Sequence, residues 1–353
     1  MGHVMFARLV VDELRKNTPE LSPCLLAKPL NENPVATEAK YDAVVSFDGS
    51  GTHTNIQSAI DAAPDKGTNW FTILVKPGVY QGPIVIPKQK HHIFISGEEM
   101  ESTVLTWSYN VNDRKGIATN LFDPGVLVRS DDFKAENLTI ENTSGDHGQA
   151  LAMIVNGDRA VFDHCRILGW QDTLMVNDGR KYFTNCYIAG RVDFIYGSGT
   201  AVFDHCEIHS KNGGYVTAAN TPQDHPFGLV FLNCKLTGDS TPWNATNGQV
   251  QFEKTGVKAY LGRPWRAYAS VAFINCDMGA HIKPVGWHNW GNTNNELTAR
   301  YAEYNNTGLG ANSEKRVAWV KQLNADEAKE LTIGKILGGA DNWKPDIAPR
   351  LNN

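Results

Sequence analysis

The sequence repeats one pattern at an interval that strongly restricts how the chain can fold. A cysteine is followed seven residues later by an aspartate in two places, Cys165 to Asp172 and Cys186 to Asp193, and the copies lie 21 residues apart. A period near 20 residues is the signature of a solenoid, in which each turn of chain stacks on the one before. If the cysteines stack, the aspartates stack as well, on one face and roughly 5 Å apart, the rung spacing of a parallel sheet.

The repeat continues beyond these two copies. From residue 126 onward, similar short segments recur, each with an inward-facing residue, a polar turn residue and then an aliphatic residue; they lie at 135–140, 162–167, 183–188, 203–208, 231–236 and 273–278. Their turn residues are 27, 21, 20, 28 and 42 positions apart, so the excess length must leave the solenoid as loops. Short strands at this period, without helices between them, predict an all-β fold that is a right-handed parallel β-helix.

Two kinds of side chain occupy fixed places in the repeat. Five of the six cysteines share one position, which favours a stack of buried free thiols over disulfides. His164 and His205 share the turn position with asparagines at 137, 185, 233 and 275. We therefore expect these histidines to belong to a hydrogen-bonded ladder rather than to a catalytic site.

The ends of the solenoid need caps. We expect residues 1–40 to be an N-terminal arm and residues 41–353 to be one β-helix domain that carries the catalytic site. Thr54 is expected to cap a short helix that ends before Pro64 and closes one end. Asn324 is expected to cap a helix over 325–331, which lies against the far end or a flank.

Composition excludes several classes of protein. The chain has 353 residues, 41% of them hydrophobic, and a net charge of −5. No basic stripe is present, so nucleic acid is not expected as a partner. No apolar run approaches the ~18 residues that a membrane span requires.

The stacked aspartates suggest acid–base chemistry. Two ionised carboxylates ~5 Å apart repel by roughly 3 kcal/mol, about two pKa units, so one should stay protonated near neutral pH. Arg263 could hold its partner ionised through a bidentate pair, and Trp265 offers a flat face for a sugar ring. Aspartates at rung corners are often only turn residues, so spacing alone leaves a structural role open.

Several motifs together resemble the pectin methylesterases, aspartyl esterases that remove methyl groups from homogalacturonan. The resemblance covers nearly everything from residue 41 to the C-terminus and includes a Gly-x-Tyr motif at residues 78–80. Four segments are similar to the active-site motifs of that family: Gln149–Ala152, Gln171–Leu174, Gly190–Gly197 and Leu261–Trp265. Any one of them is weak, but four in this order on a β-helical repeat are specific.

The resemblance implies a mechanism and a β-helix of the pectin-lyase type. Asp193 would attack the ester carbonyl, and protonated Asp172 would donate to the departing methanol and then activate water. Gln171, helped by Gln149, would donate hydrogen bonds to the oxyanion, a role in which one lost donor typically costs ~10²–10³ in rate. Arg263 would orient Asp193 and keep it charged.

The resemblance also implies how substrate is bound. Trp265 would pack on the galacturonate ring, and Phe194, Tyr196 and Arg191 are further candidates for substrate contact, although Phe194 and Tyr196 need not both face the cleft. No metal and no cofactor are expected. The implied partner is pectin, and the protein is expected to be a secreted monomer whose leader is not part of this chain. Long polar loops at 110–123 and 212–227 look more like the bacterial or invertebrate branch than the plant one.

Other readings stay open at this point. Pectate lyases and polygalacturonases share the β-helix, but we find neither a calcium site with a basic residue for proton abstraction nor the aspartate cluster with histidine. A non-catalytic carbohydrate-binding β-helix is a further possibility. So is a related esterase or thioesterase that acts on a different ester.

Overall fold

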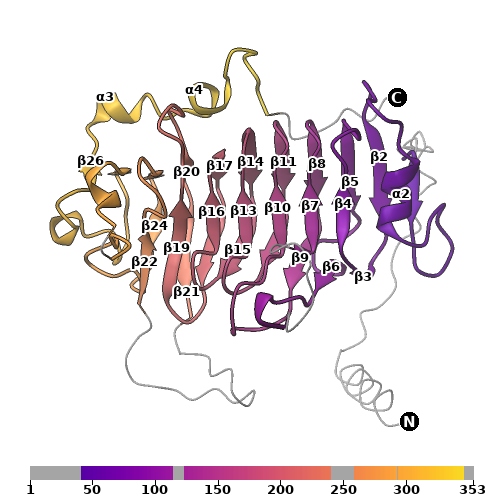
Figure 1. Ribbon diagram of the computed structural model, residues 1–353, viewed down its shortest axis with the longest axis horizontal. Helices are drawn as coiled ribbons and strands as arrows, with labels where there is room; N and C mark the ends of the chain where they lie inside the picture. The colour runs from indigo at the N-terminus through magenta and orange to yellow at the C-terminus, as the bar shows by residue number, and fades with distance from the viewer. Residues whose placement is uncertain (1–40, 114–122, 240–257, 292, 346–353) are drawn as a thin grey trace, which may run out of the picture. The chain divides into compact units, whose positions relative to one another are not determined.

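The computed structural model describes residues 41–113, 123–239, 258–291 and 293–345. In these ranges short parallel strands stack into three sheets, and each turn in the middle of the chain contributes one strand to each sheet (Figure 1). The fold is the right-handed parallel β-helix that the repeat predicts, with the handedness that parallel crossovers prefer. The arm expected over residues 1–40 lies outside the described residues.

The three sheets run along the solenoid. Sheet A has 11 strands: β1 (Ala43–Val45), β2 (Phe71–Val75), β5 (Ile93–Gly97), β8 (Phe133–Glu136), β11 (Ala160–Asp163), β14 (Arg180–Thr184), β17 (Thr200–Asp204), β20 (Leu229–Leu232), β23 (Ser270–Ile274), β25 (Arg300–Tyr304) and β26 (Lys321–Gln322). Sheet B has 8: β3 (Gly78–Gln81), β6 (Thr103–Trp107), β9 (Thr139–Asn142), β12 (Arg166–Leu168), β15 (Tyr187–Gly190), β18 (Glu207–Ser210), β21 (Lys235–Gly238) and β24 (Asp277–Met278). Sheet C has 7: β4 (Ile84–Ile86), β7 (Val126–Val128), β10 (Met153–Val155), β13 (Leu174–Val176), β16 (Ile195–Gly197), β19 (Gly214–Ala219) and β22 (Ala259–Gly262).

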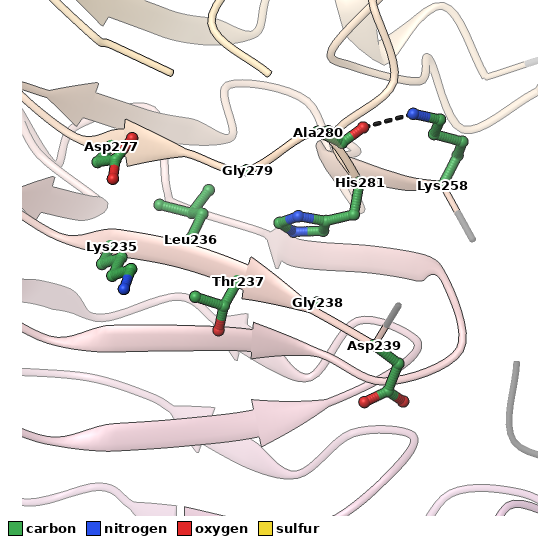
Figure 2. A pocket seen from close by; sticks show the side chains of 10 residues that line it. All are labelled: Lys235, Leu236, Thr237, Gly238, Asp239, Lys258, Asp277, Gly279, Ala280 and His281. Atoms are coloured by element: carbon green, nitrogen blue, oxygen red, sulfur yellow. Dashed lines mark hydrogen bonds between the residues drawn. The ribbon is translucent and has the colours of Figure 1, made fainter. Parts of the chain in front are cut away.

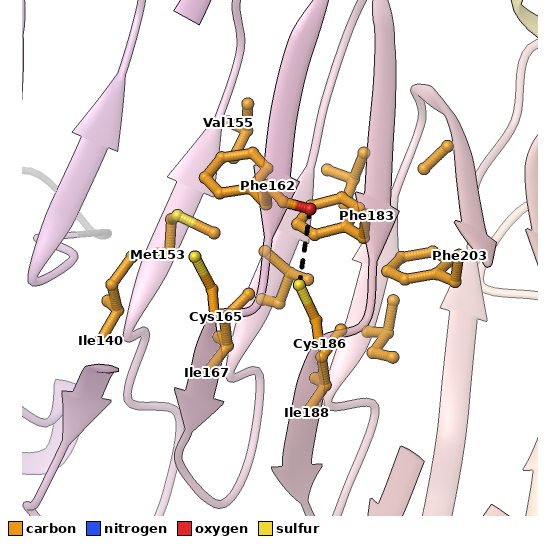
Figure 3. Packing of buried hydrophobic residues seen from close by; sticks show 14 of the residues in the cluster. Ile140, Met153, Val155, Phe162, Cys165, Ile167, Phe183, Cys186, Ile188 and Phe203 are labelled. Atoms are coloured by element: carbon orange, nitrogen blue, oxygen red, sulfur yellow. Dashed lines mark hydrogen bonds between the residues drawn. The ribbon is translucent and has the colours of Figure 1, made fainter. Parts of the chain in front are cut away.

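Identical side chains stack in the interior because the strands pair in register. Consecutive phenylalanine rings lie 4.4–4.8 Å apart and within 10° of parallel, close to the rung spacing, in the order Phe162, Phe183, Phe203, Phe231 and Phe273. The five repeat cysteines are buried free thiols, as expected. Figure 3 shows the two columns side by side, where the Cys186 thiol donates to the Phe162 carbonyl oxygen at 3.5 Å.

The turn ladder explains the two histidines. Its residues all adopt left-handed backbone with φ between 48° and 55°: Asn137, His164, Asn185, His205, Asn233, Asn275 and Asn305. Asparagine tolerates this region best among residues with a side chain, which accounts for its recurrence. Asn185 donates to Asp163 of the previous rung at 2.9 Å, and His164 contacts the same carboxyl at 2.8 Å. The histidines therefore belong to the hydrogen-bonded ladder, as expected.

The N-terminal helix begins one residue later than expected. Helix α2 (Ile56–Ala62) is capped by Asn55, whose side chain accepts the Ser58 N–H, and not by Thr54. It packs Ile56, Ala59 and Ile60 at the first rungs, close to β1, β2 and β4. Gln57 bonds both the N–H and the carbonyl of Val85, which satisfies backbone groups at the exposed start of sheet C.

The C-terminal helices lie along sheet A. The Asn324 capping box is present, but α3 (Ala325–Ala328) is only 4 residues long and a second helix, α4 (Ile333–Leu337), follows it. Ile336 and Leu337 pack on the outer face of sheet A, and Arg180 holds the end of α4 through the Leu337 and Gly338 carbonyls. Of the two places expected for the C-terminal helix, the far end of the solenoid and a flank, the flank is therefore correct (Figure 1). Short 3-10 turns are Val111–Asp113 (η1), Asn295–Leu297 (η2) and Ser313–Lys315 (η3). Among the helices described, none has the length and apolar character needed to cross a bilayer.

A buried ion pair closes the C-terminal end of the core. The phenylalanine column continues in register from Phe273 to Glu303, so a carboxylate occupies the next place. Glu303 accepts from Arg316 and from the Trp287 indole, both at 2.8 Å, and it is 2% exposed. The pair stands where the column would place a further ring, next to Trp287, whose ring centroid lies 5.7 Å from that of Phe273. The repeat did not predict it.

Candidate active site

Sheet C brings the two repeat aspartates together. β13 and β16 pair with Leu174 opposite Ile195, which places Asp172 and Asp193 on adjacent rungs, each two residues before its strand position. The Asp172 N–H donates to the Val192 carbonyl at 3.0 Å and holds the two corners in line. Both aspartates have left-handed backbone, with φ of 61° and 51°. This conformation is sparsely populated by non-glycine residues and is frequent where function needs it.

A small cleft opens over the pair. Its volume is about 190 Å³, and its walls come from five successive rungs and from the turn that follows them: Gln149, Gln171, Asp172, Asp193, Tyr196, Ala218, Arg263, Trp265 and Trp290. All five residues expected to be catalytic are therefore neighbours, together with Trp265 and Tyr196 of the expected substrate contacts. The two aspartates are only 5% and 6% exposed, so their charges are poorly solvated.

Asp193 is held by Arg263. The guanidinium donates to both carboxyl oxygens, at 2.9 and 2.7 Å, which is the bidentate geometry expected from the sequence. Burial raises the pKa of Asp193 above its ordinary value, and Arg263 opposes that rise. The carboxylate is thereby fixed in direction as well as in charge.

Asp172 has the opposite character. Its pKa is raised to about 7, first by burial and then by the charge of Asp193, while a hydrogen bond from Gln149 lowers it. The Gln149 Nε2–Asp172 Oδ2 distance is 2.9 Å. Two carboxyl groups whose environments separate their pKa values can divide the work of nucleophile and acid.

A bulge directs Gln149 toward Asp172. Gln149 pairs with Gln171, whereas further along Met153 pairs with Leu174. The earlier rung therefore holds one extra residue between these pairs, and such a bulge re-aims side chains next to active sites. Gln171 lines the cleft from the adjacent rung.

Arg263 reaches the pair because a glycine lets two rungs approach. A Cβ atom on Gly262 would lie 1.9 Å from Thr217 Oγ1, so only glycine fits before the arginine. The Arg263 N–H donates to the Thr217 carbonyl at 3.0 Å and the Trp265 N–H to the Ala219 carbonyl at 3.0 Å. Trp265 is half-buried and meets Tyr196 edge-on, with ring centroids 6.0 Å apart.

Two expected substrate contacts lie elsewhere. Phe194 is fully buried in the interior, so the expectation that it contacts substrate is wrong. It lies in the corner before β16, where its ring turns inward onto Gly190, while Tyr196 points to the outer face. Arg191 does not line the cleft and pairs with Asp146 at 2.6 Å.

Other tryptophans lie both inside and outside the cleft. Trp287 is a core residue, 1% exposed, and Trp170 is outside the cleft lining. Trp290 lines the cleft, whereas Trp243 lies outside the described residues. Tyr215, which stacks on Arg263 with the guanidinium carbon 3.9 Å from the ring centroid, was missed. Its register partner Tyr260 is next to the Leu261–Trp265 motif, so alignment of this rung could have revealed it.

A larger hollow on sheet B lacks comparable chemistry. It measures about 400 Å³ and is lined by Lys235, Leu236, Thr237, Gly238, Asp239, Lys258, Asp277, Gly279, Ala280 and His281. Asp239 pairs with His209 at 2.9 Å, and Lys258 donates to the Ala280 carbonyl. Figure 2 shows Asp239 and Asp277 at opposite ends of the hollow, so no carboxylate pair forms there.

A β-helix whose outer face holds one arginine-fixed carboxylate beside a second carboxyl with pKa about 7 has the equipment of an aspartate-based hydrolase. The comparisons with known proteins agree with this class. A family model described as Pectinesterase matches residues 42–340. The chain belongs to the pectinesterase family and is an enzyme, a carboxylic ester hydrolase.

Several curated relatives come from plants. Over 293 residues the chain is 42% identical to "Pectinesterase 31" of Arabidopsis thaliana, which covers 80% of this chain and 88% of the relative. It is 34% identical to "Pectinesterase/pectinesterase inhibitor U1" of Solanum lycopersicum over 86% of this chain. Several relatives are longer, and the chain spans about half of their length.

Solved structures confirm the fold. "Pectin methylesterase from Carrot" superposes with a TM-score of 0.77 at 32% identity, covering 86% of this chain and 94% of that one. "Pectin methylesterase PemA from Erwinia chrysanthemi" gives 0.72 at 29% identity, covering 88% and 99%. The plant enzymes are thus more similar than this bacterial one, so the expectation of a bacterial or invertebrate branch is not supported. The readings as a lyase, a polygalacturonase or a non-catalytic β-helix are set aside.

Proposed function

We propose that this chain hydrolyses the C6 methyl esters of homogalacturonan in pectin, with Asp193 as nucleophile and Asp172 as general acid and then general base. One observation carries the assignment of roles: the two carboxyls occupy adjacent rungs, and only Asp193 is held by the bidentate Arg263. The solved structure of a pectin methylesterase in complex with a hexasaccharide is similar to this chain, at 29% identity and a TM-score of 0.73, which supports an oligosaccharide in this cleft.

Acylation comes first. A carboxylate oxygen of Asp193 attacks the C6 carbonyl carbon, and the carbonyl oxygen becomes an oxyanion. Gln149 is engaged with Asp172, so Gln171 is the main donor to that oxyanion. When the intermediate collapses, the C–OCH₃ bond breaks and the leaving methoxide takes the Asp172 proton, which gives methanol and an acyl-enzyme anhydride.

Deacylation reverses the roles. Asp172, now a carboxylate, takes a proton from water as the water oxygen attacks the galacturonyl carbon. The bond to Asp193 breaks and returns its electron pair to that carboxylate, which Arg263 stabilises. The product carboxyl group keeps the second proton of the water and loses it to solvent, which gives free galacturonate. Asp172 is again protonated for the next cycle. Trp265 supplies the flat face on which the sugar ring packs.

The reaction is tested by its products. Highly methylated pectin is expected to release methanol with no change in chain length, whereas a lyase or a polygalacturonase would shorten the polymer. Activity on a different ester or thioester with none on pectin would overturn the substrate. Because pectin is a wall polymer, we propose that the enzyme acts outside the cell as a monomer.

Activity is expected to persist after exhaustive treatment with a chelator of divalent cations, because the proposed steps use only carboxyl, amide and guanidinium groups. Methanol release before and after chelation measures this. Loss of activity that calcium restores would contradict the mechanism and indicate a metal-dependent site.

The pH dependence should report Asp172. Acylation needs its proton, so kcat/KM is expected to fall as pH rises through about 7, the pKa of this group. The Gln149 hydrogen bond lowers that pKa, so Gln149→Leu is expected to raise it and to move the alkaline limb to higher pH. A limb that stays in place or moves to lower pH would contradict the role of Asp172 as the acid.

A further inference from the structure

The proposed mechanism depends on Arg263, and the structure holds this side chain from both sides. The guanidinium carbon lies 3.9 Å from the ring centroid of Tyr215 and 3.9 Å from that of Trp290. A planar guanidinium between two rings retains both its stacking and its in-plane donors. Its donors remain free to bond both oxygens of Asp193.

Tyr215, one of the two rings that contact Arg263, is itself supported by a stack of side chains. Tyr215 stacks on Tyr260 of the next rung with centroids 5.0 Å apart and an angle of 8°. The other flank of Tyr260 faces Lys283, whose ammonium lies 4.0 Å from the centroid. Tyr215 and Tyr260 lie on paired strands of sheet C, so packing and register fix the positions of their rings.

Trp290, the second ring on Arg263, does not lie on a strand. It comes three residues after Trp287, the last residue of this segment that pairs with sheet C, and it adopts left-handed backbone with φ of 64°. Bulky L residues seldom adopt this conformation unless neighbouring groups impose it. The group that does so here is His288, whose Nδ1 accepts the Trp290 N–H at 3.1 Å.

His288 contacts both sides of this arrangement, Trp290 and the pair of tyrosines. Its ring meets those of Tyr215 and Tyr260 edge-on, with centroids 5.6 and 5.3 Å apart. The backbone N–H of His288 donates to the Gly262 carbonyl at 3.0 Å. Nδ1 can accept only if it carries no proton, so the neutral ring is required. Burial, followed by the charges of Arg263 and Lys283, lowers the pKa of His288 and favours that form.

We propose that His288 is a positioning residue: it holds Trp290 against Arg263, and through Arg263 it fixes the nucleophile. The inference rests on the proposed role of Asp193. His288 does not line the cleft and touches no reacting atom, so it acts on the orientation of the carboxylate. Its loss should therefore lower kcat and leave KM almost unchanged.

The test separates the acceptor from the ring. His288→Phe retains an aromatic edge against the tyrosines and removes the acceptor; kcat on a methylated oligogalacturonide is expected to fall ~10- to 100-fold, as for a misplaced catalytic group. His288→Asn places an amide oxygen near the Nδ1 position and is expected to recover most of the activity. His281→Phe, which removes a partly buried imidazole from the sheet B hollow, is the matched control and should retain wild-type kcat.

Either of two results would overturn the proposal: wild-type kcat in His288→Phe, or an equal loss in His288→Asn, which would show that an acceptor at this position does not restore activity. If His288→Phe does not fold, His288→Leu removes the acceptor with less bulk and is read in the same way. Failure of the proposed function is distinguishable, because it would show as an active Asp193→Asn whatever the His288 variants do.

Discussion

Asp193→Asn is expected to reduce methanol release by at least ~10⁴-fold, because an amide cannot form the acyl-enzyme and the remaining groups supply only oxyanion stabilisation and binding. Asparagine keeps nearly the same shape and one oxygen for Arg263, so the cleft should be preserved. The measurement is kcat on methylated oligogalacturonide by single-turnover and steady-state kinetics. Activity within ten-fold of wild type would exclude Asp193 as the nucleophile.

The same variant should unfold normally. The pKa of Asp193 is raised, which means that the folded state penalises the ionised form at any pH above the ordinary carboxyl range. Removal of that charge removes the free-energy cost of burying it and its repulsion with Asp172. Both gains offset the lost pairing with Arg263. The free energy of unfolding is expected to change by less than about 1 kcal/mol, and a larger loss would mean that the activity measurement reports misfolding.

Arg316→Met is expected to lower the free energy of unfolding by about 3–5 kcal/mol, the usual cost of leaving a buried charge without its partner. Glu303 and Arg316 have side chains only 3% and 2% exposed and lie 2.8 Å apart. Arg316 also donates to the Gly310 and Pro284 carbonyls, which would lose that donor. Urea unfolding monitored by tryptophan fluorescence measures the effect.

The matched control removes both charges. Glu303→Leu combined with Arg316→Met leaves no unpaired carboxylate and restores an apolar place after Phe273, so it should recover a substantial part of the loss. If the single variant unfolds like wild type, the ion pair does not close the core. If the double variant is no better than the single one, the lost carbonyl contacts, rather than the orphaned carboxylate, set the cost.

The repeat predicted the centre of the molecule well because register there is fixed by identical neighbours. Each rung between Phe162 and Phe231 offers the same interior column, so a slip would turn that column outward. The Cys165 and Cys186 interval therefore placed Asp172 and Asp193 on adjacent rungs with no further information. The same logic predicted the free thiols and the turn ladder.

The corners and ends were less predictable because they are not part of any repeat. Phe194 precedes its strand, so strand alternation says nothing about its direction, and only its packing on Gly190 turns it inward. Glu303 occupies a phenylalanine place and is intelligible only with Arg316 beside it. The position of Trp290 against Arg263 depends on a single hydrogen bond to His288, and no sequence period predicts such a bond.

Capture of the acyl-enzyme tests the central claim most directly. Asp172→Asn lacks the base for deacylation, so it should accumulate a covalent adduct when given an oligogalacturonide ester whose leaving group needs no protonation. Intact-mass analysis followed by peptide mapping is expected to find one galacturonyl adduct per chain, on Asp193. Release of the leaving group with no adduct, or an adduct on another residue, would contradict the mechanism.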